Sequence, residues 1–217
     1  MFSSLTLLIL SSLLSLGLLG FRIFLTKNGT YFFLAWNLFL AWVPFLISLK
    51  VSSDWSTHFK KAKEVFLLGA WLAFFPNAAY ILTDFFHLGA KTGIPLWFDL
   101  ILISSFAWNG LVLGYFSLLK VQNVMEQITN RWVSWLAVTF CLFLGSYGIY
   151  LGRFERWNSW EVLTEPTLLF GQIAHHILNP LQYKQMVGMT FFFGLFLMMG
   201  YLTFFHLAYH KPFSKTS

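Results

Sequence analysis

The sequence predicts an all-α fold: a polytopic integral membrane helix bundle of about six transmembrane helices, forming one domain over residues 1–217. The first observation behind this prediction is composition. Hydrophobic residues make up 58% of the chain and charged residues only 10%, with a mean hydropathy of +0.68, whereas a soluble domain carries about 25% charged residues. The second observation is a series of six apolar stretches of about the 20 residues that a membrane crossing requires. The composition excludes a soluble enzyme, a disordered chain and a nucleic-acid-binding protein, despite the net charge of +6.

The predicted spans follow one another along the chain with polar segments between them. They cover residues 2–21, 31–49, 65–87, 96–119, 132–151 and 186–209. We expect the first to be a retained helix, because no Lys or Arg precedes its apolar run and no small-residue cleavage site follows it. In the third span, Pro76 lacks an amide donor and predicts a kink.

Two glycine pairs are spaced four residues apart in the fourth and fifth spans. They are Gly110 with Gly114, and Gly148 with Gly152. This spacing lets helix backbones approach closely, which predicts packing within the bundle and offers a possible surface for a homo-oligomer.

An amphipathic helix is expected in the last loop, between Pro166 and Pro180. Its apolar residues recur at helical spacing on one face, and its polar residues, among them His175 and His176, line the other. A helix of this kind lies at the membrane interface and does not cross it. Adjacent histidines lie about 100° apart on a helix, so we interpret this pair as a solvated face.

The distribution of Lys and Arg predicts the orientation. One side of the predicted topology holds eight of the 14 basic residues, including the compact cluster of Lys60, Lys61 and Lys63. The other side holds six. The richer side is expected to be cytoplasmic, with both termini inside the cell.

A polar stripe on the third span predicts a site at its exoplasmic end. Asn77, Tyr80, Asp84 and His87 fall on one face of the predicted helix, and such a stripe must face protein, water or a ligand and not lipid. The helix dipole disfavours the Asp84 anion near the C-terminal end, so we expect a cationic partner. Asp99 gives a weaker signal, because an acid in the first turn of a helix is favoured by the dipole alone.

The segment after the fifth span combines charged and aromatic residues, among them Arg153, Arg156 and Trp157. In one interpretation, the two arginines clamp Asp84 and Asp99. In the other, they bind an anionic headgroup while Trp157 lies at headgroup level.

No metal or cofactor is expected. The single cysteine, Cys141, excludes a cysteine-based zinc site, and Asp84 with His87 supplies only two metal ligands. Asn37 and Asn109 each follow an Ala-Trp pair within a span, and both are expected to form hydrogen bonds across helices.

Several of these segments together resemble a bacterial family of small polytopic membrane proteins catalogued as domain of unknown function 1361. The matching segments are Ala35-Trp36-Asn37, Phe74-Phe75-Pro76-Asn77-Ala78-Ala79-Tyr80 leading to Thr83-Asp84, Pro95-Leu96-Trp97-Phe98-Asp99, and Gly152-Arg153 followed by Arg156-Trp157-Asn158-Ser159-Trp160. The resemblance implies a multi-pass protein of the bacterial cytoplasmic (inner) membrane and implies no activity.

Three functions remain open from the sequence. The first is an integral membrane protein of the lipid bilayer that binds a small polar or anionic ligand, or an anionic lipid headgroup, in an exoplasm-facing cavity, for transport or sensing. The second is a membrane-embedded enzyme acting on a lipid-linked substrate, with Asp84 or Asp99 as general base. The third is a structural or assembly protein. The chain has no recognisable catalytic motif.

Overall fold

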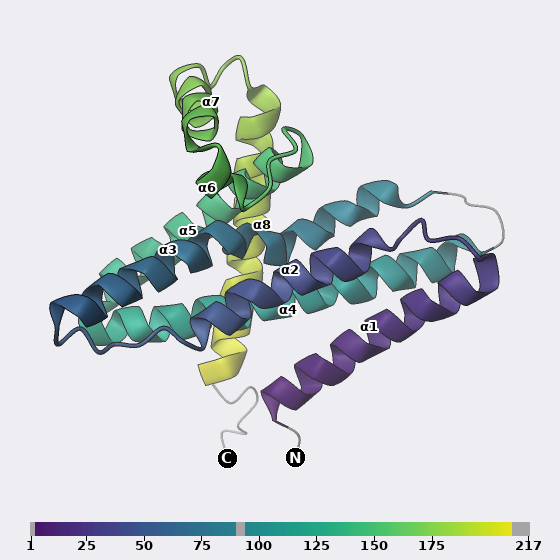
Figure 1. The fold of residues 1–217 in the computed structure, drawn as a ribbon, viewed down its shortest axis with the longest axis horizontal. Helices are drawn as coiled ribbons and strands as arrows, with labels where there is room; N and C mark the ends of the chain where they lie inside the picture. The colour runs from purple at the N-terminus through teal and green to yellow at the C-terminus, as the bar shows by residue number, and fades with distance from the viewer. Residues whose placement is uncertain (1–2, 90–93, 210–217) are drawn as a thin grey trace, which may run out of the picture.

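The computed structural model describes residues 3–89 and 94–209 and confirms the all-α fold. Figure 1 shows the order of the elements. The helices are α1 (Ser4–Thr26), α2 (Phe33–Ser48), α3 (His58–Tyr80), α4 (Leu96–Ile128), α5 (Arg131–Arg153), α6 (Glu161–Thr164), α7 (Pro166–Leu178) and α8 (Lys184–Tyr209). A 3₁₀ helix, η1 (Ile81–His87), continues directly from α3.

Five helical segments in the described residues are long and apolar enough to cross a membrane. They are Ser4–Thr26, Lys60–His87, Leu96–Ile128, Arg131–Arg153 and Lys184–Tyr209. The second predicted span corresponds to α2, which is apolar but only 16 residues long, so a count of six spans is not confirmed. The five long apolar helices indicate an integral membrane protein.

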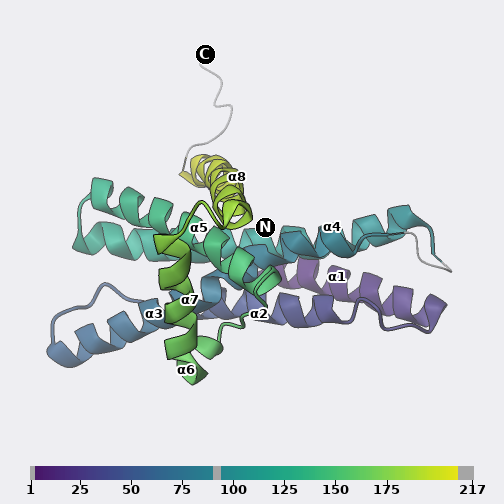
Figure 2. The ribbon, with the colours of Figure 1, turned by 90° about the horizontal axis from the view of Figure 1, so that it is seen from above.

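The helices form a layered bundle in which α3 is central to the candidate site. α2 packs against both α3 and α4, and α5 packs against α3 and α8. α1 lies at the edge and packs mainly against α4. Figures 1 and 2 show α8 crossing the other long helices steeply, with α6 and α7 projecting beyond one end of α5.

The α3 helix remains α-helical through Pro76 as far as Tyr80, and the change to 3₁₀ geometry begins at Ile81. The predicted kink at Pro76 is therefore not confirmed. Leaving the α-helix at Ile81 places Asp84 and His87 on η1, so the four-residue stripe expected on one regular helix is divided between two elements.

Both predicted glycine pairs lie against α3 and allow a close approach. A Cβ atom on Gly110 would lie 2.3 Å from the backbone oxygen of Ala78, and one on Gly148 would lie 2.6 Å from Cγ of Pro76. Gly114 and Gly152 likewise face side chains of α3. These surfaces are thus occupied within the chain. The homo-oligomer through these glycines stays a prediction.

Candidate ligand-binding cavity

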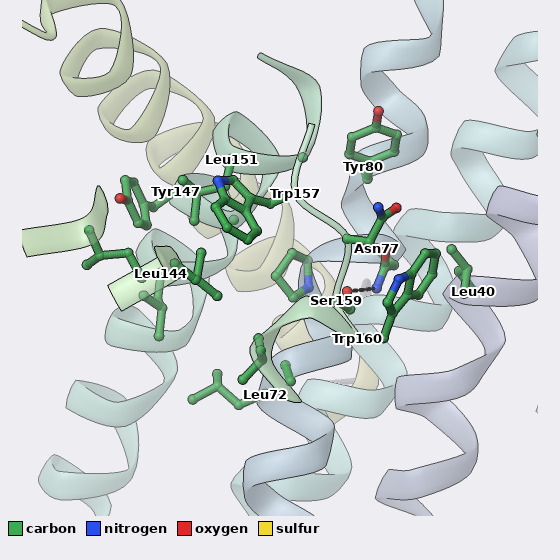
Figure 3. A pocket seen from close by; sticks show the side chains of 18 of the residues that line it. Leu40, Leu72, Asn77, Tyr80, Leu144, Tyr147, Leu151, Trp157, Ser159 and Trp160 are labelled. Atoms are coloured by element: carbon green, nitrogen blue, oxygen red, sulfur yellow. Dashed lines mark hydrogen bonds between the residues drawn. The ribbon is translucent and has the colours of Figure 1, made fainter. Parts of the chain in front are cut away.

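A cavity of about 430 Å³ lies between α2, α3 and α5 and is bordered by the segment containing α6 and α7 (Figure 3). This volume is within the range of about 300–1,000 Å³ that is typical of small-molecule sites. Its apolar lining includes Leu40, Leu72, Ala73, Leu144, Leu151, Val162, Leu169, Phe170 and Ile173. Gly69 also lines the cavity and is exposed, so the cavity reaches the molecular surface at this point.

The polarity of the lining changes along the helices. On α3, Gly69 and Leu72 lie at the apolar end, whereas Asn77 and Tyr80 follow about two turns later. Asn37 lies near the start of the antiparallel α2 and completes the polar end. The α3 wall of the cavity therefore changes from an apolar end at Gly69 to a polar end next to η1, where the lining also includes Leu151 of α5.

Hydrogen bonds position the loop after α5 at this polar end. The Asn77 amide nitrogen donates to Ser159 Oγ at 2.7 Å and to the Phe74 carbonyl at 3.0 Å. Figure 3 shows the Asn77–Ser159 bond beside Trp160, with Trp157 and Tyr147 on the other side of the cavity. Trp157 donates from its indole nitrogen to Gln172 Oε1 on α7 at 2.6 Å. Aromatic rings and amides thus frame the polar end.

Asp84 lies behind the polar end and does not line the cavity. It is buried and accepts a hydrogen bond from Asn37 Nδ2 at 2.8 Å. Its other oxygen lies 3.7 Å from Arg153 Nη1 and has no hydrogen-bond partner. Arg153 is therefore the cationic partner of Asp84, in a loose contact that leaves Asp84 Oδ1 without a hydrogen bond.

Asp99 forms a separate ion pair that the sequence interpretation assigned wrongly. Its carboxylate accepts from Arg22 Nε at 2.7 Å and from Arg22 Nη2 at 3.2 Å, and Arg22 also lies over the ring of Tyr31 at 4.3 Å. The clamp from Arg153 or Arg156 to Asp99 is thus contradicted. Arg22 reaches Asp99 because α1 packs against α4, which the sequence alone does not reveal.

Arg156 lies at the turn that leads from α5 into the loop. Its φ angle is 61°, in the left-handed region that non-glycine residues rarely adopt, and the Trp157 amide donates back to the Leu151 carbonyl at 3.1 Å. Its side chain is exposed and forms no ion pair within residues 3–89 and 94–209. The turn thus presents a guanidinium group next to Trp157.

Three predicted residues lie apart from this arrangement or connect other elements. Asn109 binds α1 by accepting from Ser11 Oγ at 2.7 Å and donating to Ser15 Oγ at 2.9 Å. Asn37 connects α2 to η1 through Asp84. His87 is exposed, packs against the ring of Phe33 and does not line the cavity. No group of three His, Cys, Asp or Glu residues in the described part of the chain could hold a metal ion.

A buried polar cluster behind the cavity was missed by the sequence interpretation. His176 is only 1% exposed, so the expectation that it belongs to a solvated face is wrong, whereas its neighbour His175 is exposed. Its Nδ1 atom lies 2.9 Å from the hydroxyl of Tyr147. Glu155 accepts from Tyr150 at 3.0 Å and from Gln172 at 2.7 Å. Only the burial of one face of α7 could have revealed this cluster.

The family described as "Protein of unknown function (DUF1361)" matches residues 36–199. The chain belongs to this family. The DUF1361 match extends from α2 into α8 and includes every residue that lines the cavity, whereas α1 precedes it. No curated protein and no solved structure matched the chain in the two other searches.

Proposed function

We propose that this protein binds an amphiphilic ligand, with the apolar part in the cavity and a polar or anionic headgroup at the polar end, for transport or sensing of that ligand. The observation that carries the proposal is the change in polarity along the α3 wall of the cavity, from Gly69 and Leu72 to Asn77 and Tyr80, with Asn37 of α2 also in the lining. Apolar surface binds hydrocarbon through burial, and a few placed polar groups fix the orientation.

The exposed edge of the cavity supports a ligand that enters from the bilayer. Gly69 lies in a segment long and apolar enough to cross a membrane and is exposed where it lines the cavity. A hydrocarbon chain can therefore reach the cavity without passing through water. Neither Arg153 nor Arg156 lines the cavity. The anionic preference rests on Arg156, which has no ion pair among residues 3–89 and 94–209, and on Arg153, which contacts Asp84 only loosely. Arginine presents several N–H donors in a geometry that suits phosphate and carboxylate groups.

We place the protein in the bacterial cytoplasmic membrane as a multi-pass protein, with both termini in the cytoplasm and the polar end of the cavity toward the exoplasm. The support is the excess of Lys and Arg at the other end of the bundle, where Lys60, Lys61 and Lys63 begin α3.

Filling the cavity tests the binding proposal. A Cβ atom on Gly69 meets no atom within 4 Å, so Gly69→Leu adds a side chain at the exposed edge of the cavity without a backbone clash. Gly188→Leu is the matched control, because Gly188 is equally unobstructed and lies outside the cavity. Native mass spectrometry should show lipid retained by the parent protein and by Gly188→Leu, and lost from Gly69→Leu. Equal retention by all three proteins would contradict the proposal.

A second variant tests the headgroup. Arg156→Gly removes the guanidinium group at a left-handed backbone position that glycine adopts without steric cost. With phosphatidylglycerol and phosphatidylethanolamine as probes, we expect this variant to lose most of the preference for the anionic lipid. A preference that is unchanged in Arg156→Gly would remove Arg156 from the site.

A further inference from the structure

The lining of the cavity carries no charged side chain, although charged residues lie close to it. No Asp, Glu, Lys or Arg is among the described residues that border the cavity. An anion held inside such a site would lack the countercharge that offsets its removal from water. The lining therefore favours an uncharged group inside the cavity. An anionic group on the same ligand would lie outside the lining, at Arg156.

Two asparagine side chains at the polar end offer hydrogen-bond acceptors. Asn37 Nδ2 donates to the Asp84 carboxylate, and Asn77 Nδ2 donates to the Phe74 carbonyl. Because a carboxylate and a carbonyl only accept, these bonds fix the orientation of both amides. The Oδ1 atoms of Asn37 and Asn77 have no hydrogen-bond partner among the described residues, and both side chains are only partly buried. An ionised phosphate or carboxylate has no proton to donate to these oxygens, whereas a hydroxyl group has one.

The same end of the cavity also offers hydrogen-bond donors. Ser159 Oγ accepts from Asn77 at 2.7 Å, which leaves its hydroxyl proton free to donate to a ligand. The indole nitrogen of Trp160 forms no hydrogen bond within residues 3–89 and 94–209. An ammonium group would satisfy the two amide oxygens but not these donors. Hydroxyl groups both donate and accept, so a group with several hydroxyls satisfies both kinds of partner.

Two indole rings complete the polar end. Figure 3 shows Trp160 beside Asn77 and Trp157 on the other side of the cavity. The Trp157 indole nitrogen already donates to Gln172 Oε1 at 2.6 Å, which fixes that ring in place. The face of an aromatic ring carries negative charge density and attracts polarised C–H groups. A sugar presents C–H groups on its faces and hydroxyls at its edge, and it therefore fits a site in which indoles lie next to amides.

We propose that the ligand is a glycolipid, with its hydrocarbon in the apolar part of the cavity and an uncharged sugar at the polar end. The sugar hydroxyls donate to Asn37 Oδ1 and Asn77 Oδ1 and accept from Ser159 and Trp160. A sugar joined to the hydrocarbon without an intervening phosphate suits a lining that has no charge. The inference rests on the proposed function, because it names the chemical class of the ligand in the same cavity.

A comparison of lipids that differ only in the headgroup tests this inference. Glucosyl diacylglycerol, diacylglycerol, phosphatidic acid and phosphatidylethanolamine with identical acyl chains are offered at equal concentration, and native mass spectrometry measures the retained fraction of each. The protein is purified in a polyoxyethylene detergent, because a maltoside or glucoside detergent would itself compete for the site. We expect the glucosyl lipid to be retained about tenfold or more above each of the other three.

Two modified probes identify which part of the glycolipid is recognised. Glucosyl diacylglycerol with methylated hydroxyls keeps its acceptor oxygens but cannot donate to Asn37 and Asn77. We expect its retention to fall to that of diacylglycerol. Methyl glucoside carries the sugar without the hydrocarbon and should not displace the glucosyl lipid when both are at equal concentration.

A substitution at Trp160 tests the aromatic contact. Trp160 is 41% exposed, so Trp160→Leu removes the indole without opening the protein core. We expect the preference for the glucosyl lipid over diacylglycerol to fall about fivefold. Trp132→Leu is the matched control, because Trp132 is also exposed and lies outside the lining. This variant should show the preference of the parent protein.

Four results would each overturn the inference. They are equal retention of the four lipids, retention of phosphatidic acid or phosphatidylethanolamine at the level of the glucosyl lipid, undiminished binding of the methylated form, and a preference that Trp160→Leu leaves unchanged. Displacement by methyl glucoside would replace the glycolipid with a free sugar. Failure of the binding proposal is a separate result, because it appears as equal retention of every lipid by the parent protein and by Gly69→Leu, whichever headgroup is preferred.

Discussion

Arg22 and Asp99 form a two-point ion pair between α1 and α4, with both side chains only 2% exposed. The pair connects α1 to the bundle at the ends of both helices nearest the polar end of the cavity. Two charges in a low-dielectric environment stabilise each other, but each becomes strongly unfavourable if its partner is removed.

Breaking this pair should therefore be more damaging than removing it. We expect Arg22→Met to lower the free energy of unfolding by about 3–5 kcal/mol, because Asp99 remains buried without a counter-charge. The double variant Arg22→Met/Asp99→Leu should recover much of that loss. Reversible unfolding in mixed micelles measures both, and a double variant no more stable than the single one would contradict this account.

The close approach of α4 to α3 predicts a steric effect at Gly110. Gly110→Ala places a Cβ atom 2.3 Å from the Ala78 carbonyl oxygen, and we expect a loss of about 1–3 kcal/mol in unfolding free energy from the forced backbone shift. Gly17→Ala, at a helix position with no atom within 4 Å, should be neutral or slightly stabilising. Similar melting temperatures for the two variants would show that α3 and α4 can separate at no cost.

The hydrogen bonds of Asn109 predict how firmly α1 is held. Asn109→Leu removes the contacts to Ser11 and Ser15, and we expect a loss of about 1–2 kcal/mol, in line with polar contacts between membrane helices. Trp108→Leu is the control, since Trp108 is adjacent and exposed. Steric trapping or unfolding in micelles measures the difference in stability between Asn109→Leu and Trp108→Leu. Equal stabilities would indicate that α1 docks only through apolar packing and would contradict the prediction.

Two substitutions of Asp84 separate hydrogen bonding from charge. Asp84→Asn retains an oxygen that can accept from Asn37, whereas Asp84→Ala leaves the Asn37 amide without that partner. We expect Asp84→Ala to lose about 1–3 kcal/mol more stability than Asp84→Asn, the usual cost of an unsatisfied buried group. The prediction fails if thermal unfolding in detergent ranks the two variants in the opposite order.

The sequence was informative where the signal is local. The prolines at 166 and 180 bracket a helical pattern, and α7 runs from Pro166 to Leu178. Five of the six predicted apolar stretches likewise correspond to long helices in the described residues, and the exception is α2. Composition and periodicity are sufficient for these features, because both follow from the burial of backbone groups and from contact with lipid.

The orientation of α7 could not be derived in the same way. In a soluble protein its apolar face would be buried, yet Leu168, Phe170, Ile177 and Leu178 are exposed, and His176 is buried. The side of α7 that packs against the protein carries Leu169 as well as His176, so it is neither the apolar face nor the polar face of the pattern. The sequence shows the amphipathic pattern, but it does not show whether lipid, water or protein contacts each face of the helix.

Ion-pair partners also required the fold. Asp84 was expected to pair with Arg153 or Arg156, and the structure places Arg153 beside it. The same reasoning failed for Asp99, because which basic residue reaches it depends on α1 docking beside α4. Distances along the chain carry no information on such docking.

The 16 residues of α2 extend over roughly 24 Å, less than the hydrocarbon thickness of about 30 Å in a typical bilayer. A bilayer that surrounds this helix as a crossing segment must become locally thinner, or draw in the polar residues at its ends. Asn37 lies near one of those ends and borders the cavity. Lipid headgroups next to α2 would thus lie deeper than elsewhere around the protein. The membrane surface would be depressed beside this short helix, which would bring headgroups to the level of the cavity.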